Sequence, residues 1–208
     1  YDTFMEYTTK AYASEKSPLE LSFIPIHPGD ILSYGGYHFE VKLLKGHTFG
    51  QCGLYEPEKK LMFVGDQLMT TIVPIVGTQE TDLGMLKCYL DSLGDLKHNY
   101  KDCYFLPCHY GEIRNVEKEV NRIILGYLEK CEIMKHVLEE AGTALTTRDI
   151  GVRTYGRSQG PPDYAHFASC TYIWAKTFSC MEYMMGEGFV ERSERDGIIY
   201  WKAPSIHF

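Results

Sequence analysis

Three residues with metal-binding side chains each follow an apolar, strand-like run that ends in glycine or proline. His47 stands in GHTFG at 46–50, Asp66 ends FVGD at 63–66, and His109 lies in LPCHYG at 106–111. Loops at strand ends can bring side chains to one point, so we expect the trio to converge. Imidazole nitrogen and carboxylate oxygen both bind zinc, and an aspartate can bridge two ions. The pattern predicts metal-assisted hydrolysis by a metal-bound water held at Asp66.

Each residue also has a simpler interpretation. A histidine after glycine is often only a polar loop residue, and an aspartate after glycine often belongs to a turn. Taken alone, His109 is equally ambiguous, and the shared order and strand-end position are what favour a metal site. The remaining histidines lack this context and are interpreted as surface or packing residues: His27, His38, His98, His136, His166 and His207.

The loop that carries His109 offers further candidates. Tyr110 and Arg114 lie in it and are candidates for substrate contact, although a solvated loop is the simpler interpretation. Cys108 stands beside His109 and is the one cysteine with a possible role at the site. The other cysteines are interpreted as small buried apolar residues.

Hydrophobic periodicity predicts the elements that must position these loops. Alternating or continuous apolar runs predict strands over 21–26, 31–34, 37–44, 53–55, 61–64 and 103–106. Helical spacing predicts a short helix within 1–20, a helix over 80–98 and a long helix from Asn115, its N-cap, to about 140. The apolar stretch 67–80 has no clear period, so we expect it to pack near the site or against a partner.

The pattern changes after Gly142. Thr146 to Asp149 has capping-box spacing, a Gly-Pro-Pro break stands at 160–162, and a helix is predicted over 163–186. A hairpin over 188–201 follows, with a polar tip at Asp196-Gly197. Helices followed by a two-stranded hairpin are typical of a winged helix. We therefore predict two domains, 1–130 and 131–208.

Composition restricts the function classes. The chain has 208 residues and a net charge of −7, which argues against nucleic acid as a partner. No apolar run reaches the length of a membrane span, so no membrane association is expected. Seven scattered cysteines without a CxxC motif argue against structural disulfides and favour a reducing cytoplasm. The chain lacks an initial methionine, and we interpret its start as a truncation or a processed end.

The three motifs resemble the later motifs of the metallo-β-lactamase superfamily, which run GHTxG, then an apolar residue with GD, then PxHG. Phe49 replaces a frequent proline, and Tyr110 interrupts the usual His-Gly pair. The resemblance covers roughly 20–140, and the tail resembles the winged-helix extension of one branch. It implies an α/β fold: the C-terminal half of an αβ/βα sandwich, followed by a small winged-helix-like domain.

The resemblance also implies roles for the trio. His47 would bind a first zinc ion, Asp66 would bridge, and His109 would bind a second. The remaining family ligands come from an HxHxDH motif, which is absent here and would belong before residue 1. With only these ligands, we expect the chain alone to bind metal weakly and to be inactive. Half a sandwich leaves apolar surface exposed, so we expect a homodimer or pairing with the missing N-terminal half.

The implied activity is hydrolysis of a small-molecule or ester-type substrate: a thioester, lactone, lactam or phosphodiester. One alternative is a winged-helix binding or structural module with a non-catalytic half-domain. That alternative needs a basic recognition helix, but the helix over 163–186 has Lys176 as its single basic residue, beside Asp163 and Glu182. A diiron redox protein that shares the fold is a further alternative, although no flavin-binding segment follows.

Overall fold

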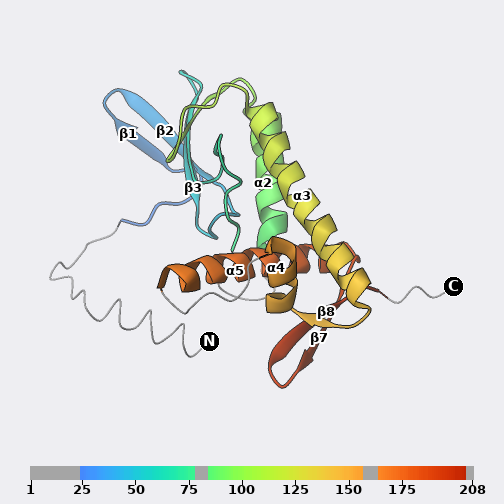
Figure 1. Ribbon diagram of the computed structural model, residues 1–208. Helices are drawn as coiled ribbons and strands as arrows, with labels where there is room; N and C mark the ends of the chain where they lie inside the picture. Colours follow the sequence, from blue (N-terminus) through green and yellow to red (C-terminus); the bar gives the residue numbers. More distant parts are fainter. Residues whose placement is uncertain (1–23, 78–83, 157–163, 205–208) are drawn as a thin grey trace.

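The computed structural model describes residues 24–77, 84–156 and 164–204. Two sheets and four helices occupy this part of the chain (Figure 1). The strands are β1 (Ile31–Tyr34), β2 (Tyr37–Leu43), β3 (Cys52–Glu56), β4 (Leu61–Gly65), β5 (Tyr104–Pro107), β6 (Leu145–Thr146), β7 (Glu191–Arg195) and β8 (Ile198–Lys202). The helices are α2 (Met85–Asn99), α3 (Val116–Ala141), α4 (Thr147–Tyr155) and α5 (Tyr164–Gly186). The predicted α/β fold is confirmed.

The larger sheet has the strand order β1-β2-β3-β4-β5. Neighbours from β1 to β4 are antiparallel, whereas β4 and β5 are parallel. Gly35 and Gly36 both have positive φ, 58° and 83°, which is the two-residue turn that matches strand twist in a hairpin. It follows from these pairings that β2, β4 and β5 run in the same direction and end at the same edge.

Helices α2 and α3 lie side by side and cover one face of this sheet (Figure 1). Each turns a buried stripe at three- and four-residue spacing toward the core, as the periodicity predicted. The N-cap at Asn115 is confirmed, because its side chain accepts a hydrogen bond from the Lys118 N–H at 3.0 Å. From the sheet, Met62 and Val64 of β4 enter the same core, and both are fully buried.

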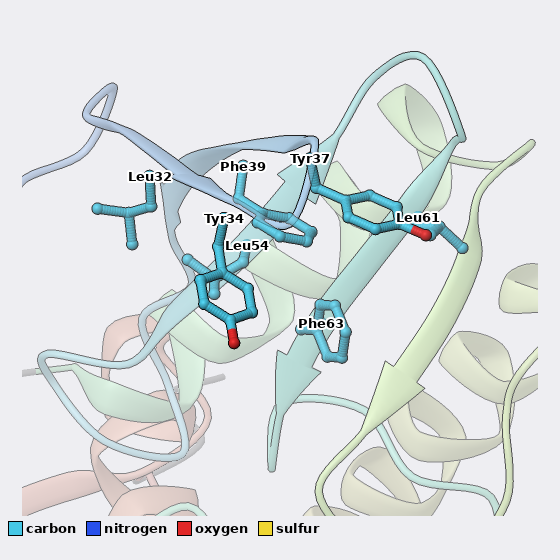
Figure 2. Close-up of a pocket in the computed structure, with 7 residues that line it drawn as sticks. All are labelled: Leu32, Tyr34, Tyr37, Phe39, Leu54, Leu61 and Phe63. Atoms are coloured by element: carbon cyan, nitrogen blue, oxygen red, sulfur yellow. The ribbon is translucent and has the colours of Figure 1, made fainter.

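The opposite face of the sheet is apolar and partly exposed. Side chains of β1 to β4 form a hollow of about 570 Å³ on it (Figure 2). Its lining residues are Leu32, Tyr34, Tyr37, Phe39, Leu54, Leu61 and Phe63, which we call the outer-face patch. Within it the Phe39 and Phe63 rings meet edge to face at 5.8 Å. Alternation along the strands thus gives the sheet two apolar faces, of which the helices cover one.

The C-terminal elements pack on the lower ends of α2 and α3 (Figure 1). The predicted capping box is confirmed, since the Thr146 side chain and the Asp149 backbone and carboxylate bond reciprocally. Trp201 of β8 is fully buried, and its indole N–H donates to the Thr147 hydroxyl at 2.9 Å. Helix, helix and hairpin follow in the predicted order. The winged-helix assignment and the boundary at residue 130 remain predictions, and α3 is continuous across that boundary.

Some predictions fall on or beside residues outside the described part. The short helix within 1–20 and the Gly-Pro-Pro break at 160–162 lie outside it, as does the start of the helix predicted over 80–98. The strand predicted over 21–26 is wrong for 24–26, which have no regular structure, and Ile24 is exposed. The long helix predicted from Asn115 to about 140 is confirmed, because α3 is continuous from Val116 to Ala141. Within the described residues, no helix combines the length and apolar character needed to cross a membrane.

Candidate metal centre

The parallel arrangement of three strands brings the predicted trio together. Asp66 directly follows β4, His109 follows β5, and His47 follows β2 after a short loop. Since these strands end at one edge, the three side chains converge there. His47 Nε2 lies 3.5 Å from Asp66 Oδ2, and His109 Nε2 lies 3.4 Å from Asp66 Oδ1. The carboxylate thus stands between the two imidazoles with one oxygen toward each.

The loop that carries His47 is closed at its base. The Leu44 N–H donates to the Gln51 carbonyl at 2.7 Å. Gly46 passes against helix α2 so closely that an added Cβ would lie 2.6 Å from the Tyr89 Cα. Only glycine fits this contact, which explains the first residue of the GHTFG motif in packing terms.

The turn that carries Asp66 depends on two glutamines. Gly65 has a φ of 56°, and the Gln51 amide donates to the Val64 carbonyl at 2.9 Å across it. Gln67 is fully buried, and its amide nitrogen contacts the Lys45 carbonyl at 3.3 Å in the His47 loop. The two motif loops are therefore joined by side-chain hydrogen bonds as well as by strand order. Neither glutamine was singled out from the sequence, because a lone glutamine carries no local signal.

His47 has a defined tautomer. Its Nδ1 lies 2.7 Å from the carbonyl oxygen of Ile75. A carbonyl oxygen can only accept, so Nδ1 carries a hydrogen, and in the neutral ring Nε2 presents a lone pair toward Asp66. A lone pair and a carboxylate oxygen do not attract each other unless a cation or a proton stands between them. Asp66 Oδ1 is also buried without a hydrogen-bond partner among the described residues.

These observations fit a metal ion. Neutral imidazole with its other nitrogen bonded to a backbone carbonyl is the usual form of a histidine ligand. The trio supplies two nitrogen donors and two oxygen donors, the ligand types that zinc takes. However, the described residues contain no group of three or more His, Cys, Asp or Glu side chains placed so that together they could hold a metal ion. The arrangement is two His-Asp pairs that share one carboxylate, and the metal role of each residue remains a prediction.

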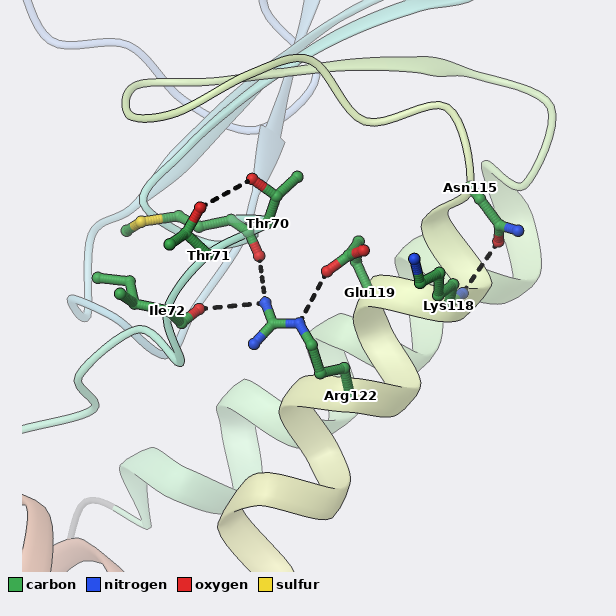
Figure 3. A network of polar contacts seen from close by, with 8 residues as sticks. Thr70, Thr71, Ile72, Asn115, Lys118, Glu119 and Arg122 are labelled. Atoms are coloured by element: carbon green, nitrogen blue, oxygen red, sulfur yellow. Dashed lines mark hydrogen bonds and ion pairs between the residues drawn. The ribbon is translucent and has the colours of Figure 1, made fainter.

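The segment after Asp66 is fixed to the helices, although it has no regular structure. The Arg122 side chain, itself paired with Glu119 at 2.8 Å, donates to the carbonyls of Met69 and Ile72 (Figure 3). The expectation that the apolar stretch 67–80 packs near the site is confirmed for its described part, 67–77. This segment supplies the Ile75 carbonyl that His47 contacts.

The His109 loop is held by a bridge between Phe105 and Ile113, which exchange backbone hydrogen bonds of 3.0 and 2.9 Å. The loop is open to solvent, and the thiol-bearing Cys108 is exposed. The guanidinium of Arg114 lies 3.2 Å from Glu112 and over the Tyr104 ring. Hydrogen bonds from the Tyr104 hydroxyl and from Arg114 lower the pKa of Glu112. The proposed substrate contacts of Tyr110 and Arg114 remain predictions.

Tyr110 occupies a strained backbone position. Its φ is 68°, in the left-handed region that costs a residue with a Cβ about 1–2 kcal/mol. This is the position where the superfamily motif has glycine. We expect Tyr110→Gly to raise the free energy of unfolding by up to about 1 kcal/mol, after the entropy cost of glycine is subtracted. Urea denaturation measures the change, and Tyr110→Ala is the matched control because it keeps the Cβ. Equal effects of the two variants would contradict strain at this position.

Comparisons with known proteins agree with the motifs. No protein-family model matches the chain. A hydroxyacylglutathione hydrolase of Haemophilus influenzae is 50% identical over 40 residues, which are 19% of this chain and 19% of that protein. The crystal structure of a metallo-β-lactamase family protein of Thermus thermophilus has a TM-score of 0.73 at 21% identity and covers 96% of this chain. That of a β-lactamase domain protein of Burkholderia ambifaria has a TM-score of 0.79 at 18% identity and covers 98%.

The match extends over nearly all of this chain but over only part of each relative. The chain spans 64% of the Thermus protein and 59% of the Burkholderia protein. Both structural matches include the tail as well as the sheet and its two helices, because they cover almost the whole chain. Strand order, converging loops and these two structures agree, and the chain therefore has the fold of the metallo-β-lactamase superfamily.

Proposed function

We propose that the chain carries part of the active site of a metal-dependent hydrolase that acts on a small ester-type substrate. One observation supports this most directly: the two oxygens of Asp66 face Nε2 of His47 and Nε2 of His109 at 3.5 and 3.4 Å. When bound there, a divalent ion such as zinc would supply Lewis acidity for water activation and for polarising the substrate oxygen. The 40-residue similarity to a hydroxyacylglutathione hydrolase is in keeping with hydrolysis.

In this proposal the chain's own residues have distinct tasks. His47, His109 and Asp66 would hold the ions, since the two oxygens of Asp66 face Nε2 of different imidazoles. The Ile75 carbonyl holds the His47 ring in the tautomer that a ligand needs. Tyr110 stands beside His109, with ring centroids 6.4 Å apart, and in this proposal its exposed ring contacts the substrate.

We further propose that the site is incomplete within this chain. Protein-held zinc normally has three or four protein ligands. Here the two histidines share a single carboxylate, so each ion would have only two protein ligands. The purified chain should therefore bind zinc weakly, retain fewer than two ions after dialysis and show no turnover. Two tightly held ions per chain would contradict incompleteness.

Complementation tests the hydrolase activity itself. The part of the Burkholderia relative that this chain does not match can be supplied as a fusion or as a separate chain. We expect chelator-sensitive hydrolysis of a thioester, lactone or phosphodiester to appear only in the complemented protein. His47→Ala and His109→Ala should abolish it, whereas His98→Ala, on the exposed end of α2, should not. A complemented, zinc-loaded protein without activity on any of these substrates would count against the hydrolase.

The position of Lys176 argues against the winged-helix binding module. This single basic residue of α5 lies over the Tyr127 ring, with its Nζ 4.7 Å from the centroid. Burial lowers the pKa of the Lys176 ammonium group. A side chain directed into the core is a poor contact for a phosphate backbone, so α5 lacks the cationic surface that a recognition helix needs.

The outer-face patch is the surface on which we expect a partner chain to bind. Tyr34 is 84% exposed and Phe63 42% exposed in a region otherwise built from leucine, phenylalanine and a second tyrosine. Such a patch is typical of a surface that another apolar layer covers. We propose that a second copy of the chain, or a chain with the N-terminal half of the sandwich, packs on it.

Self-association checks this interface. We expect the purified chain to form dimers at micromolar concentration and Phe63→Asp to shift it to monomers, because a charge in an apolar interface is costly to bury. Light scattering during size-exclusion chromatography measures the molar mass. Leu125→Asp is the matched control, since Leu125 is equally apolar and 58% exposed but lies on α3. A monomeric parent chain, or equal loss of dimer in both variants, would contradict self-pairing through this face and leave the second chain as the occupant to test.

A further inference from the structure

Tyr127 of helix α3 is fully buried and contacts the segment that follows Asp66. Its hydroxyl donates to the Pro74 carbonyl at 2.6 Å and accepts from the Val76 N–H at 2.8 Å. These two groups belong to the residues immediately before and after Ile75. One side chain thus fixes the backbone on both sides of a single residue, from more than 50 positions away in the sequence.

Ile75 is the residue whose carbonyl oxygen accepts from His47 Nδ1 at 2.7 Å. With the flanking groups of Pro74 and Val76 bonded to Tyr127, the direction of the Ile75 carbonyl is set. The segment has no helix or strand hydrogen bonds that could do this instead. The Tyr127 hydroxyl therefore orients the Ile75 carbonyl, and this carbonyl in turn orients the His47 ring.

We propose that Tyr127 is a positioning residue that keeps His47 in the Nδ1–H tautomer, with Nε2 free to bind a metal ion. The proposal rests on the metal-centre function proposed above and adds a residue outside the three motifs to it. A histidine ligand requires one nitrogen as donor to a fixed acceptor and the other as an available lone pair. Without the Tyr127 hydroxyl, the carbonyl can turn and the two tautomers become similar in energy.

The surroundings of Tyr127 suit this task. Burial raises the pKa of its hydroxyl well above the ordinary value, so the group keeps the hydrogen that it donates. Its ring meets the Tyr89 ring edge to face at 5.9 Å, and the Tyr89 hydroxyl donates to the Gln67 carbonyl at 2.8 Å. Tyr89 therefore bonds the start of the same segment, whereas Tyr127 bonds the end that reaches His47.

The test combines a metal-free measurement with metal affinity. Long-range proton–nitrogen correlation NMR of the metal-free chain, at a pH where imidazoles are neutral, reports the His47 tautomer. We expect the Nδ1–H form in the parent chain and a mixture in Tyr127→Phe. Zinc affinity, from competition with a chromophoric chelator, should fall by up to about 10-fold in Tyr127→Phe. This is the lower end of the loss seen when a direct partner of a metal ligand is removed, because Tyr127 acts on His47 only through the Ile75 carbonyl.

Two tyrosine variants serve as controls. Tyr89→Phe loses a buried hydrogen bond to the same segment without touching the residues beside Ile75. Tyr155→Phe removes a buried hydroxyl that has no hydrogen-bond partner among the described residues. Both should keep the Nδ1–H tautomer of His47. An unchanged tautomer in Tyr127→Phe, or the same change in Tyr89→Phe, would overturn the proposal.

The parent chain provides a test that does not depend on the folding of any variant. If its His47 is not in the Nδ1–H form, the proposal fails. The two proposals also fail separately. A parent chain that binds no zinc but shows the Tyr127-dependent tautomer contradicts the metal function alone. Zinc binding by the trio with no dependence of the tautomer on Tyr127 contradicts the positioning role alone.

Discussion

Replacing Asp66 with asparagine is expected to weaken zinc affinity by at least about 100-fold. Loss of a residue that hydrogen-bonds to a metal ligand lowers metal affinity about 10- to 100-fold. Asp66 should matter more, because it is the only group in the described chain that faces both imidazoles at their Nε2 atoms. The neutral amide removes the negative charge and one of the two oxygen donors. Competition titration with a chromophoric chelator measures the affinity.

The same substitution should not lower the stability of the metal-free chain. An asparagine amide can donate to the lone pair of His47 Nε2, which Asp66 cannot do, so the free energy of unfolding should stay the same or rise by about 1 kcal/mol. Opposite effects on affinity and stability distinguish a ligand from a structural residue. Asp102→Asn, on an exposed turn, is the control and should change neither quantity. Retained zinc affinity in Asp66→Asn would remove the basis for the metal centre.

Replacing Gly46 with alanine is expected to lower the free energy of unfolding by about 3 kcal/mol or more. The new Cβ would lie 2.4 Å from a ring carbon of Tyr89 and 2.6 Å from its Cα. The Cα belongs to helix α2, which the core holds in place, so the helix cannot yield cheaply. A φ of 149° adds backbone strain for any residue with a side chain. Urea denaturation, followed by circular dichroism, gives the change.

Gly50 provides the matched control within the same motif. A Cβ added there would meet nothing within 4 Å, and its φ is not in the positive region. Gly50→Ala should therefore change the free energy of unfolding by no more than about 0.5 kcal/mol. If both alanine variants lost the same stability, the contact between the His47 loop and Tyr89 would not be the reason for Gly46.

Local patterns predicted most of the fold, because the responsible forces act over a few residues. Alternation identified β2, a continuous apolar run after a charged turn identified β4, and the Gly35-Gly36 turn joined the first hairpin. The caps at Asn115 and Thr146 began their helices as expected. The two-residue strand β6 was missed, because its pairing with β8 joins residues more than 50 positions apart. Such a pair has no local periodicity to reveal it.

The candidate site, like the fold, was predictable from the sequence only where local patterns carry the information. His47, Asp66 and His109 were recognisable because each follows a strand-like run, and the chemistry of their side chains already indicated zinc ligands. Their distances to one another depend on the parallel pairing of β4 with β5, which no local pattern specifies. The left-handed conformation of Tyr110 also required the structure, since tyrosine is not a residue that predicts positive φ.

By itself, the sequence determined the element types, the metal-binding residue types and the resemblance to the metallo-β-lactamase superfamily, because these follow from residue chemistry and short-range spacing. Only the tertiary structure decided that the carboxylate of Asp66 stands between two imidazoles and that Ile75 and Tyr127 support one of them. Hydrogen bonds between residues 28 to 53 positions apart depend on how the helices pack on the sheet. Packing sums many weak contacts over the whole core, so the supporting residues leave no signature in their own neighbourhood of the sequence.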